Sequence, residues 1–236
     1  MGMRLKRIGG IVFLYALIIV IFLTVTYLTS TATTVVARMI PVERDNTIII
    51  DAGHGGEDGG ATSCSGILES TYNLEIALKL DDLFHLLGYR TLMIRSTDRS
   101  VYTQGDTIAA KKVSDLRQRV KIVNDTEDGL LVSIHQNTFS DSRYSGAQVF
   151  YGPNGESSNL AEQVQEAFCK SLNPESKRRA KRADGIYLMQ HIEGTGILVE
   201  CGFLSNPEEE AALRSADYQK KICCVIAATI GTFLTK

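Results

Sequence analysis

Hydrophobic and polar positions alternate along most of the chain in a pattern that predicts strands and helices in turn. Beyond residue 45, short runs rich in Ile, Val and Leu are typical of parallel strands buried on both faces. Between them lie longer segments with apolar residues three or four positions apart, which predict helices. This alternation predicts a three-layer α/β domain, in which helices flank a mostly parallel, twisted sheet.

The boundaries of these elements follow from the apolar runs and from capping residues. The expected strands are 47–51, 89–95, 130–135, 147–151, 186–189 and 197–200. The expected helices are 70–87, 114–124 capped by Ser114, 158–172 capped by Ser158, one that starts at Asn206-Pro207, and 218–233.

The longest apolar segment lies near the N-terminus. An uncharged run from Ile8 to Ala37, densest from Ile11 to Leu28, follows Arg4, Lys6 and Arg7. Eighteen helical residues span about 27 Å, close to the hydrocarbon thickness of a bilayer. A basic flank stays cytoplasmic. We therefore expect residues 1–28 to be a cytoplasmic flank and transmembrane anchor, residues 29–45 a linker, and residues 46–236 an extracytoplasmic domain.

A cleaved signal peptide is the alternative for this N-terminal segment. Signal peptides have an apolar core of about 7–15 residues that precedes a cleavage site with small residues. The apolar run here is longer, and residues 29–34 read Thr-Ser-Thr-Ala-Thr-Thr, without an Ala-x-Ala site. The sequence favours a retained anchor.

Charge and cysteine content narrow the function classes. The chain has 25 basic and 27 acidic residues, of which five basic and one acidic residue lie before residue 45, so the remainder carries a net charge of −6. A domain of this charge is not expected to bind nucleic acid. The five cysteines include no Cys-x-x-Cys pair, which argues against a structural zinc knot and a disulfide framework.

Three of the expected strands end in residues that carry chemistry. The strand 47–51 leads to His54, the strand 130–135 ends at His135, and the strand 197–200 ends at Glu200. Because ligands bind at the carboxyl ends of parallel strands, we expect these side chains to converge on one edge of the sheet.

A fourth residue, Glu69, stands just before the first long helix and completes a candidate metal set. Two imidazoles and one carboxylate, here His54, His135 and Glu69, are a common ligand set for catalytic zinc, which leaves a fourth position open for water. Glu200 is then the candidate proton acceptor. The glycine-rich loop around His54 is not expected to bind phosphate, because it carries Glu57 and Asp58 and lacks a Gly-Lys-Ser/Thr ending.

Three sequence blocks resemble those of one enzyme family. The blocks are Asp-Ala-Gly-His-Gly-Gly-Glu-Asp-Gly-Gly-Ala from Asp51 with Glu69, Ser-Ile-His-Gln-Asn from Ser133, and Val-Glu-Cys-Gly-Phe-Leu-Ser-Asn from Val199. In order and spacing they resemble the zinc-dependent N-acetylmuramoyl-L-alanine amidases of the Amidase_3 type, over essentially all of residues 47–236. The resemblance implies Zn²⁺ on His54, Glu69 and His135, and Glu200 as the catalytic carboxylate.

The resemblance also implies a substrate and a setting. These enzymes hydrolyse the amide bond between N-acetylmuramic acid and L-alanine, so the expected partner is peptidoglycan glycan with its stem peptides. A lone catalytic domain behind a short anchor is similar to the sporulation amidases of the family, which implies a role in spore cortex maturation by the muramic-δ-lactam pathway. A protein activator is a further possible partner.

Several alternatives stay open at the level of sequence. A zinc peptidase that cuts peptide cross-links would have a similar metal site, and a non-catalytic wall-binding module is the rival from another class. His191 either lines the substrate site or is an ordinary loop residue. The basic run 177–182 is either a solvated face or a binding site for the carboxylates of an anionic wall polymer.

Overall fold

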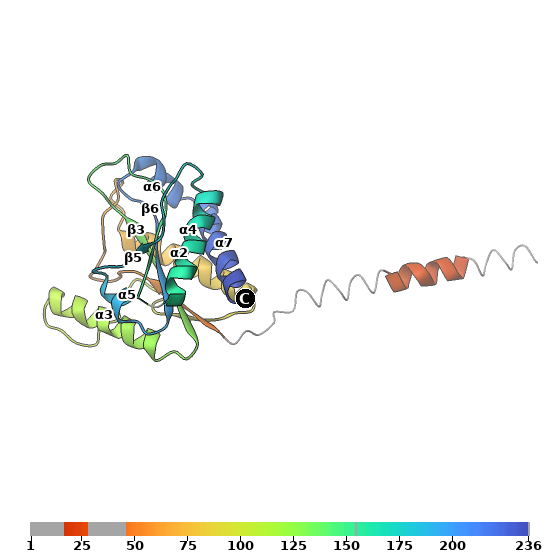
Figure 1. Ribbon diagram of the computed structural model, residues 1–236, viewed down its shortest axis with the longest axis horizontal. Coiled ribbons are helices and arrows are strands. Elements are labelled where there is room, and N and C mark those ends of the chain that lie inside the picture. The colour runs from red at the N-terminus through yellow and green to blue at the C-terminus, as the bar shows by residue number, and fades with distance from the viewer. Residues whose placement is uncertain (1–16, 28–45, 154, 236) are drawn as a thin grey trace, which may run out of the picture. The chain divides into compact units, whose positions relative to one another are not determined.

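The structure, a computed structural model, describes residues 17–27, 46–153 and 155–235 (Figure 1). The chain divides into two units, residues 1–42 and residues 43–236. In the first unit, residues 17–27 are helical with exposed side chains. No helix in the described ranges is both long and apolar enough to cross a membrane. Most of the predicted anchor and all of the predicted linker, residues 29–45, lie outside the described residues.

A six-stranded sheet forms the centre of the second unit. The strand order is β2-β1-β3-β6-β4-β5. Neighbouring strands run parallel except for β4 and β6, which are antiparallel, so the sheet is mixed rather than uniformly parallel. The strands are β1 (Thr47–Ala52), β2 (Arg90–Met93), β3 (Gly129–Asn137), β4 (Gln148–Tyr151), β5 (Lys181–Arg182) and β6 (Thr195–Phe203).

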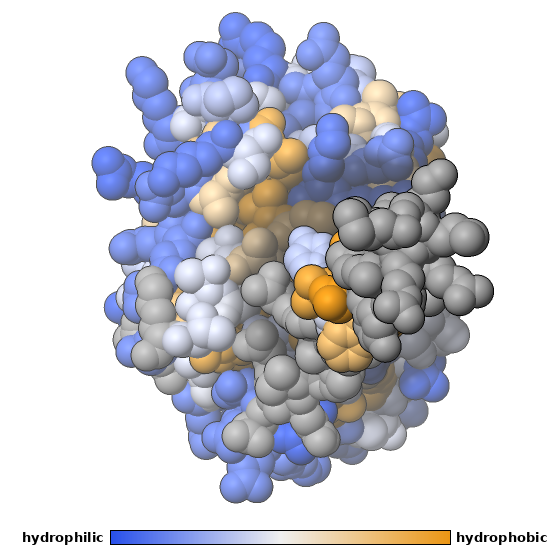
Figure 2. All heavy atoms as spheres, turned by 90° about the vertical axis from the view of Figure 1, so that its right-hand side faces the viewer, coloured by the Kyte–Doolittle hydropathy of each residue, from blue (hydrophilic) through white to orange (hydrophobic). Residues whose placement is uncertain are grey.

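Helices cover both faces of this sheet, as the sequence predicted. Two hydrophobic cores lie on opposite faces of the sheet. In the larger core, one face packs against α2 (Glu69–Leu86), α4 (Gly155–Ser171) and α7 (Ala216–Phe233) (Figure 1). In the smaller core, the other face packs against α3 (Ile108–Asn124) and α5 (Tyr187–His191). In β1, Ile48 and Ile50 belong to the larger core and Ile49 to the smaller, which is the alternation of a strand buried on both sides. On the face drawn in Figure 2, hydrophilic side chains make up most of the described surface.

One prediction about the segment 181–191 was wrong, and one strand in it was missed. The run 186–189 is not a strand but belongs largely to the short helix α5, in which the adjacent residues Leu188 and Met189 are both buried. A four-residue apolar run does not distinguish a strand from a helix, so periodicity could not decide between them. Strand β5 was missed because its two residues, Lys181 and Arg182, are exposed and charged.

Helix starts were predicted with mixed success. Asn206 caps α6 (Pro207–Leu213) as expected, because its side chain accepts the N–H groups of Glu208 and Glu209. Helix α3 instead begins at Ile108, so Ser114, six residues later, lies inside the helix rather than at its cap. The Ser114 hydroxyl accepts hydrogen bonds from the preceding loop, at the backbone N–H groups of residues 103 and 104. Helix α4 begins three residues before Ser158.

Candidate metal centre

The four residues singled out in the sequence come together at the carboxyl ends of three neighbouring strands, β1, β3 and β6. His54 follows β1, Glu69 is the first residue of α2, and His135 and Glu200 are directly paired across β3 and β6. One nitrogen or oxygen of each of His54, Glu69 and His135 lies within 4.8 Å of those of the other two. The structure therefore assembles the predicted set from four separate elements.

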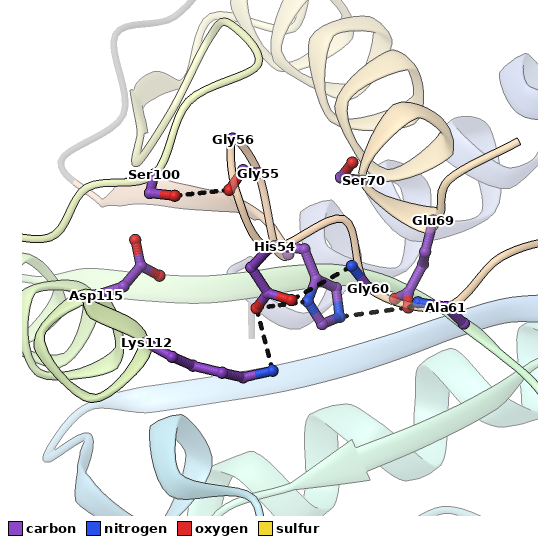
Figure 3. A network of polar contacts seen from close by, with 12 residues as sticks. His54, Gly55, Gly56, Gly60, Ala61, Glu69, Ser70, Ser100, Lys112 and Asp115 are labelled. Atoms are coloured by element: carbon purple, nitrogen blue, oxygen red, sulfur yellow. Dashed lines mark hydrogen bonds and ion pairs between the residues drawn. The ribbon is translucent and has the colours of Figure 1, made fainter. Parts of the chain in front are cut away.

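The Glu69 carboxylate lies between the two imidazoles. His54 Nε2 lies 3.3 Å from Glu69 Oε2 (Figure 3). His135 Nδ1 lies 3.0 Å from Glu69 Oε1. The two rings meet edge to face, with centroids 5.0 Å apart. Each ring thus directs one nitrogen at a different oxygen of the Glu69 carboxylate.

This set fits a divalent transition metal. Zinc is bound by histidine nitrogen and carboxylate oxygen at about 2.0–2.2 Å, so neighbouring ligand atoms of a tetrahedral site lie roughly 3.3–3.5 Å apart. The observed separations of 3.0 and 3.3 Å are close to that spacing. Burial raises the pKa of Glu69, but hydrogen bonds from His135 and His54 outweigh it, and the pKa is held well below its usual value. Glu69 is therefore ionised at neutral pH, as a metal ligand must be.

A second layer of polar groups orients these three side chains. His54 Nδ1 is 3.0 Å from Asp58 Oδ2, which leaves Nε2 to face Glu69, and Lys112 Nζ lies 3.2 Å from the same Asp58 oxygen (Figure 3). The Glu69 carboxylate also accepts the Asn73 side-chain amide and two backbone N–H groups, those of residues 61 and 136. Such partners fix the tautomer and direction of metal ligands in other proteins.

Two buried arginines hold the loop that carries His54. Arg95 is fully buried and donates to the carbonyl oxygens of Ala52 and Gly53 at 2.7 and 2.9 Å and to that of Ser70 at 3.0 Å. Arg119 donates to the His54 carbonyl at 2.8 Å and pairs with the buried Asp51 carboxylate. Hydrogen bonds from charged donors are among the stronger ones in proteins, so the two guanidinium groups fix the backbone beside two of the proposed ligands.

Glycine is required at two places by the close approach of these ligands. A Cβ atom added to Gly53 would lie 2.1 Å from His135 Nε2, and one added to Gly60 would lie 2.6 Å from Glu69 Oε2. His54 itself has φ 61°, a left-handed conformation that is uncommon outside glycine. The backbone here is shaped to admit side chains from distant elements.

Glu200 differs from every other carboxylate of the site. Its Oε2 atom is buried and has no hydrogen-bond partner among the described residues. Burial raises the pKa of Glu200 to about 7, an effect that outweighs the opposing influence of His135. A carboxyl group with a pKa near neutrality both accepts and releases protons readily, which is the property of a general acid–base catalyst.

A pocket lies beside the two candidate histidine ligands. It is lined by helices α3 and α5, which pack in the smaller core, and by the ends of the strands. Its lining includes His54, His135, Arg119 and the apolar residues Ile186, Leu188 and Leu198. His191 does not belong to this lining; it ends α5 on the surface, where its ring stacks on Tyr187 at 3.9 Å. The basic run 177–182, except for Arg182, lines two other grooves.

Sequence reasoning missed the supporting residues. Asp58 was considered only as an obstacle to phosphate, although it stands four positions after His54 in the same loop. Asn73 is one helical turn after Glu69, a spacing that places two side chains on the same face of a helix. Arg95 had no signal in the sequence, because its partners are backbone carbonyls brought near by the fold. Arg119 was missed because its contacts to the metal-site loop, the Asp51 carboxylate and the His54 carbonyl, lie more than 60 residues away in the sequence.

An α/β domain that presents a His–Glu–His set and a buried carboxylate at its strand ends has the architecture of a hydrolase. Comparison with known proteins identifies the class more narrowly. The profile of the N-acetylmuramoyl-L-alanine amidase family matches residues 48–232, and the chain belongs to this family. It is accordingly an amidase that acts on peptidoglycan.

Individual relatives agree with this assignment. The chain is 39% identical over 191 residues to the germination-specific N-acetylmuramoyl-L-alanine amidase of Bacillus subtilis, with 80% of each protein covered. Among solved structures, it is similar to the CwlD amidase of Clostridioides difficile in complex with the GerS lipoprotein, at a TM-score of 0.77 and 36% identity, covering 81% of this chain and 99% of that one. An N-acetylmuramoyl-L-alanine amidase of Clostridium difficile 630 matches at a TM-score of 0.71 and 26% identity, covering 81% and 97%.

Proposed function

We propose that this amidase is zinc-dependent, with His54, Glu69 and His135 as the metal ligands and Glu200 as the catalytic acid–base. The observation that carries the proposal is the convergence of three ligand atoms within 4.8 Å beside a buried carboxylate oxygen that has no partner. Bound zinc supplies a Lewis acid that polarises the scissile carbonyl and acidifies water.

The residues of the chain perform the proton transfers and the positioning. Glu200 accepts a proton from the attacking water and donates it to the departing amine of L-alanine. Asp58 holds the His54 ring through Nδ1, so the lone pair of Nε2 stays directed at the metal position. Ile186, Leu188 and Leu198 line the pocket with apolar surface, which excludes water and strengthens electrostatic interactions within it.

Analysis of the reaction products tests the reaction. Purified peptidoglycan is digested with the full-length zinc-loaded protein, and the new termini are identified by mass spectrometry. We expect free lactyl groups on muramic acid and peptides that begin with L-alanine. Cleavage within peptide cross-links, with the lactyl amide intact, would identify a peptidase instead.

Metal analysis tests the cofactor. The protein is expected to bind one zinc per chain, and His54→Ala and His135→Ala should each abolish stoichiometric binding. His85→Ala is the matched control, because His85 is an exposed histidine on α2. A parent protein without stoichiometric metal after reconstitution at neutral pH would contradict the proposal.

We further propose a role in spore cortex maturation. Support comes from the 39% identity to an amidase described as germination-specific. Digestion of vegetative and cortex-type peptidoglycan in parallel, and measurement of muramic-δ-lactam in spores that lack the protein, would test it. Spores with a normal δ-lactam content would exclude this role.

The N-terminal segment is proposed as a membrane anchor that holds the catalytic domain outside the cell membrane. The apolar run from Ile11 to Leu28 and the basic residues before it support this orientation. The described part of the segment, residues 17–27, is helical and exposes apolar side chains. Contiguous exposed apolar surface of this kind indicates contact with a membrane or a partner.

A protein partner is the last element of the proposal. The CwlD amidase of Clostridioides difficile was solved in complex with the GerS lipoprotein, and this chain covers 99% of that amidase. We propose that this chain also acts together with an extracytoplasmic protein that promotes its activity. Full activity of the purified chain, equal to that of the same amount of protein in native membranes, would show that no activator is needed.

A further inference from the structure

One strongly basic segment stands out on an otherwise acidic domain. Five of the six residues from Lys177 to Arg182 are lysine or arginine, whereas the chain beyond residue 44 carries a net charge of −6. The segment ends in β5, which is hydrogen-bonded to β4 and forms an edge of the sheet. Concentrated charge of one sign favours a ligand of the opposite sign.

The sheet register connects this segment to the catalytic residues. His135 is paired with Glu200, and Glu200 is paired with Gln148 on the next strand. The Gln148 side chain donates to the carbonyl oxygen of Arg179 at 2.7 Å. Arg179 therefore lies at the same level of the sheet as Glu200, two strands away. Strands are about 4.8 Å apart, so the two backbones are separated by roughly 10 Å.

The two basic residues of β5 lie on opposite faces. Lys181 is paired with Phe150, which packs with Leu198 in the smaller core, on the sheet face to which the candidate metal centre belongs. Arg182 is paired with Tyr151, which packs against the larger core on the other face. Paired residues of neighbouring strands point to the same side of a sheet, so only Lys181 shares the face of Glu200.

The cations also differ in their partners. Arg182 forms an ion pair with Asp184 at 3.3 Å. Arg178 donates to the Ser145 carbonyl at 3.0 Å and stacks over the Phe203 ring at 4.9 Å, which fixes the segment against β6. Arg179 and Lys181 are exposed, and in the described part of the chain neither lies within 4.0 Å of a carboxylate.

A groove runs along this segment. It is lined by residues 144–146 and 148, which precede and begin β4, and by residues 173–179 and 181. Gln148, which is paired with Glu200, and both Arg179 and Lys181 belong to its lining. The segment then continues through β5 to Ile186 and Leu188, which line the pocket of the candidate metal centre. One stretch of chain thus borders both the groove and the catalytic pocket.

We propose that Arg179 and Lys181 form a subsite for the carboxylates of the substrate's peptide stem, on the leaving-group side of the scissile amide. This inference rests on the proposed function, because it places the reacting bond beside Glu200. An extended peptide advances about 3.3 Å per residue, so roughly 10 Å corresponds to the second or third residue after that bond. The ligand is therefore an acidic peptide with a carboxylate at one of these positions.

Steady-state kinetics on two matched substrates test the subsite. The full-length zinc-loaded protein is given a soluble muramoyl peptide with free stem carboxylates, and the same compound with these groups converted to carboxamides. For the free acid, the double variant Arg179→Ala/Lys181→Ala is expected to raise KM about tenfold, with kcat within twofold of the parent. For the carboxamide, the variant and the parent should have the same KM.

Two variants on the same segment serve as controls. Arg182→Ala removes a cation from the opposite face and should change KM by less than twofold. A double variant with Arg179→Lys and Lys181→Arg keeps both charges and should retain most of the affinity for the free acid. The KM difference between the two substrates should shrink as salt is added, because exposed charge pairs are screened.

Each other outcome contradicts the subsite in its own way. An unchanged KM in the double variant means that the segment is a solvated face. An equal loss with the carboxamide substrate, or with Arg182→Ala, means that no specific carboxylate contact exists. A loss seen only on whole walls that retain an anionic phosphate polymer would assign the segment to that polymer instead. A parent protein that cleaves neither substrate contradicts the proposed function itself.

Discussion

One oxygen of the Glu200 carboxylate, Oε2, is buried and has no hydrogen-bond partner among the described residues, and that environment makes its role testable by a single substitution. Replacement by glutamine keeps the shape of the side chain but removes the proton acceptor. We expect Glu200→Gln to lower kcat by ~10²–10⁴-fold. The measurement is the release of peptide from peptidoglycan by the zinc-loaded protein.

The zinc content and melting temperature of the Glu200→Gln protein show whether a loss of activity comes from lost catalysis or from lost folding. Zinc content is expected to equal that of the parent, because Glu200 is not among the three converging ligands. A melting temperature at or above that of the parent is also expected, because an uncharged amide replaces a carboxylate whose buried Oε2 atom has no hydrogen-bond partner among the described residues. Activity within a few-fold of the parent would rule out the assigned role.

A substitution at Gly53 tests whether the position of the His135 ring requires a residue without a side chain beside it. A Cβ atom at this position would lie 2.1 Å from His135 Nε2, so Gly53→Ala must displace the imidazole. We expect zinc affinity to fall about 10–100-fold, as for changes in groups that orient a metal ligand. Competition with a chromogenic chelator measures the affinity.

The matched control for Gly53→Ala is Gly231→Ala on helix α7. There an added Cβ meets only the Tyr89 hydroxyl, at 3.4 Å, and alanine is favoured over glycine within a helix. Zinc affinity should be unchanged in this variant. An unchanged zinc affinity in Gly53→Ala as well would mean that the His135 ring is not held where the structure has it.

At the scale of elements, one buried ion pair joins helix α3 to strand β1 beneath the candidate metal centre. Burial raises the pKa of Asp51, but Arg119 and the Ser133 hydroxyl outweigh it, so the pKa is lowered. A carboxylate with a lowered pKa in the folded state stabilises the protein above its unfolded pKa, near 3.9. That stability is lost as the pH falls through the lower, folded-state pKa.

Acid unfolding of the metal-free protein measures this contribution. We expect Asp51→Asn to lower the free energy of unfolding at pH 7 by ~3–5 kcal/mol, because it leaves Arg119 buried without this partner. Its unfolding free energy should also depend less steeply on pH below about 4 than that of the parent. Asp141→Asn is the control, because Asp141 pairs with Arg143 at the surface, where an ion pair contributes little. Equal acid sensitivity of the parent and Asp51→Asn would contradict the prediction.

At the scale of the whole molecule, the N-terminal segment is expected to remain attached. If residues 29–45 are a flexible linker of 17 residues, their reach is roughly 20–25 Å, so the enzyme acts on glycan near the membrane. Fractionation should find intact protein of 25.9 kDa in washed membranes, open to protease only from outside. A shorter, salt-released form with its N-terminus near residue 35 would identify a signal peptide.

The class of fold and the residues of the candidate site could both be predicted from the amino-acid sequence. Buried strands such as β1 and β3 are continuous apolar runs, and long helices such as α2 and α7 have a clear apolar periodicity, so both were predicted within a few residues. The rule that ligands gather at the carboxyl ends of strands identified His54, His135 and Glu200 before any contact was known. Apolar runs, apolar periodicity and the residues that follow each strand are local properties, so they can be read from the sequence alone.

Features that depend on contacts between distant segments could not be predicted from the sequence and became visible in the folded chain. The direction of β4, the two exposed residues of β5 and the helical form of 187–191 depend on neighbours in space rather than on local periodicity. The same holds for Arg95, whose partners are backbone carbonyls of residues 52, 53 and 70. A carbonyl group is present at every position, so no residue pattern marks which ones a buried guanidinium will meet.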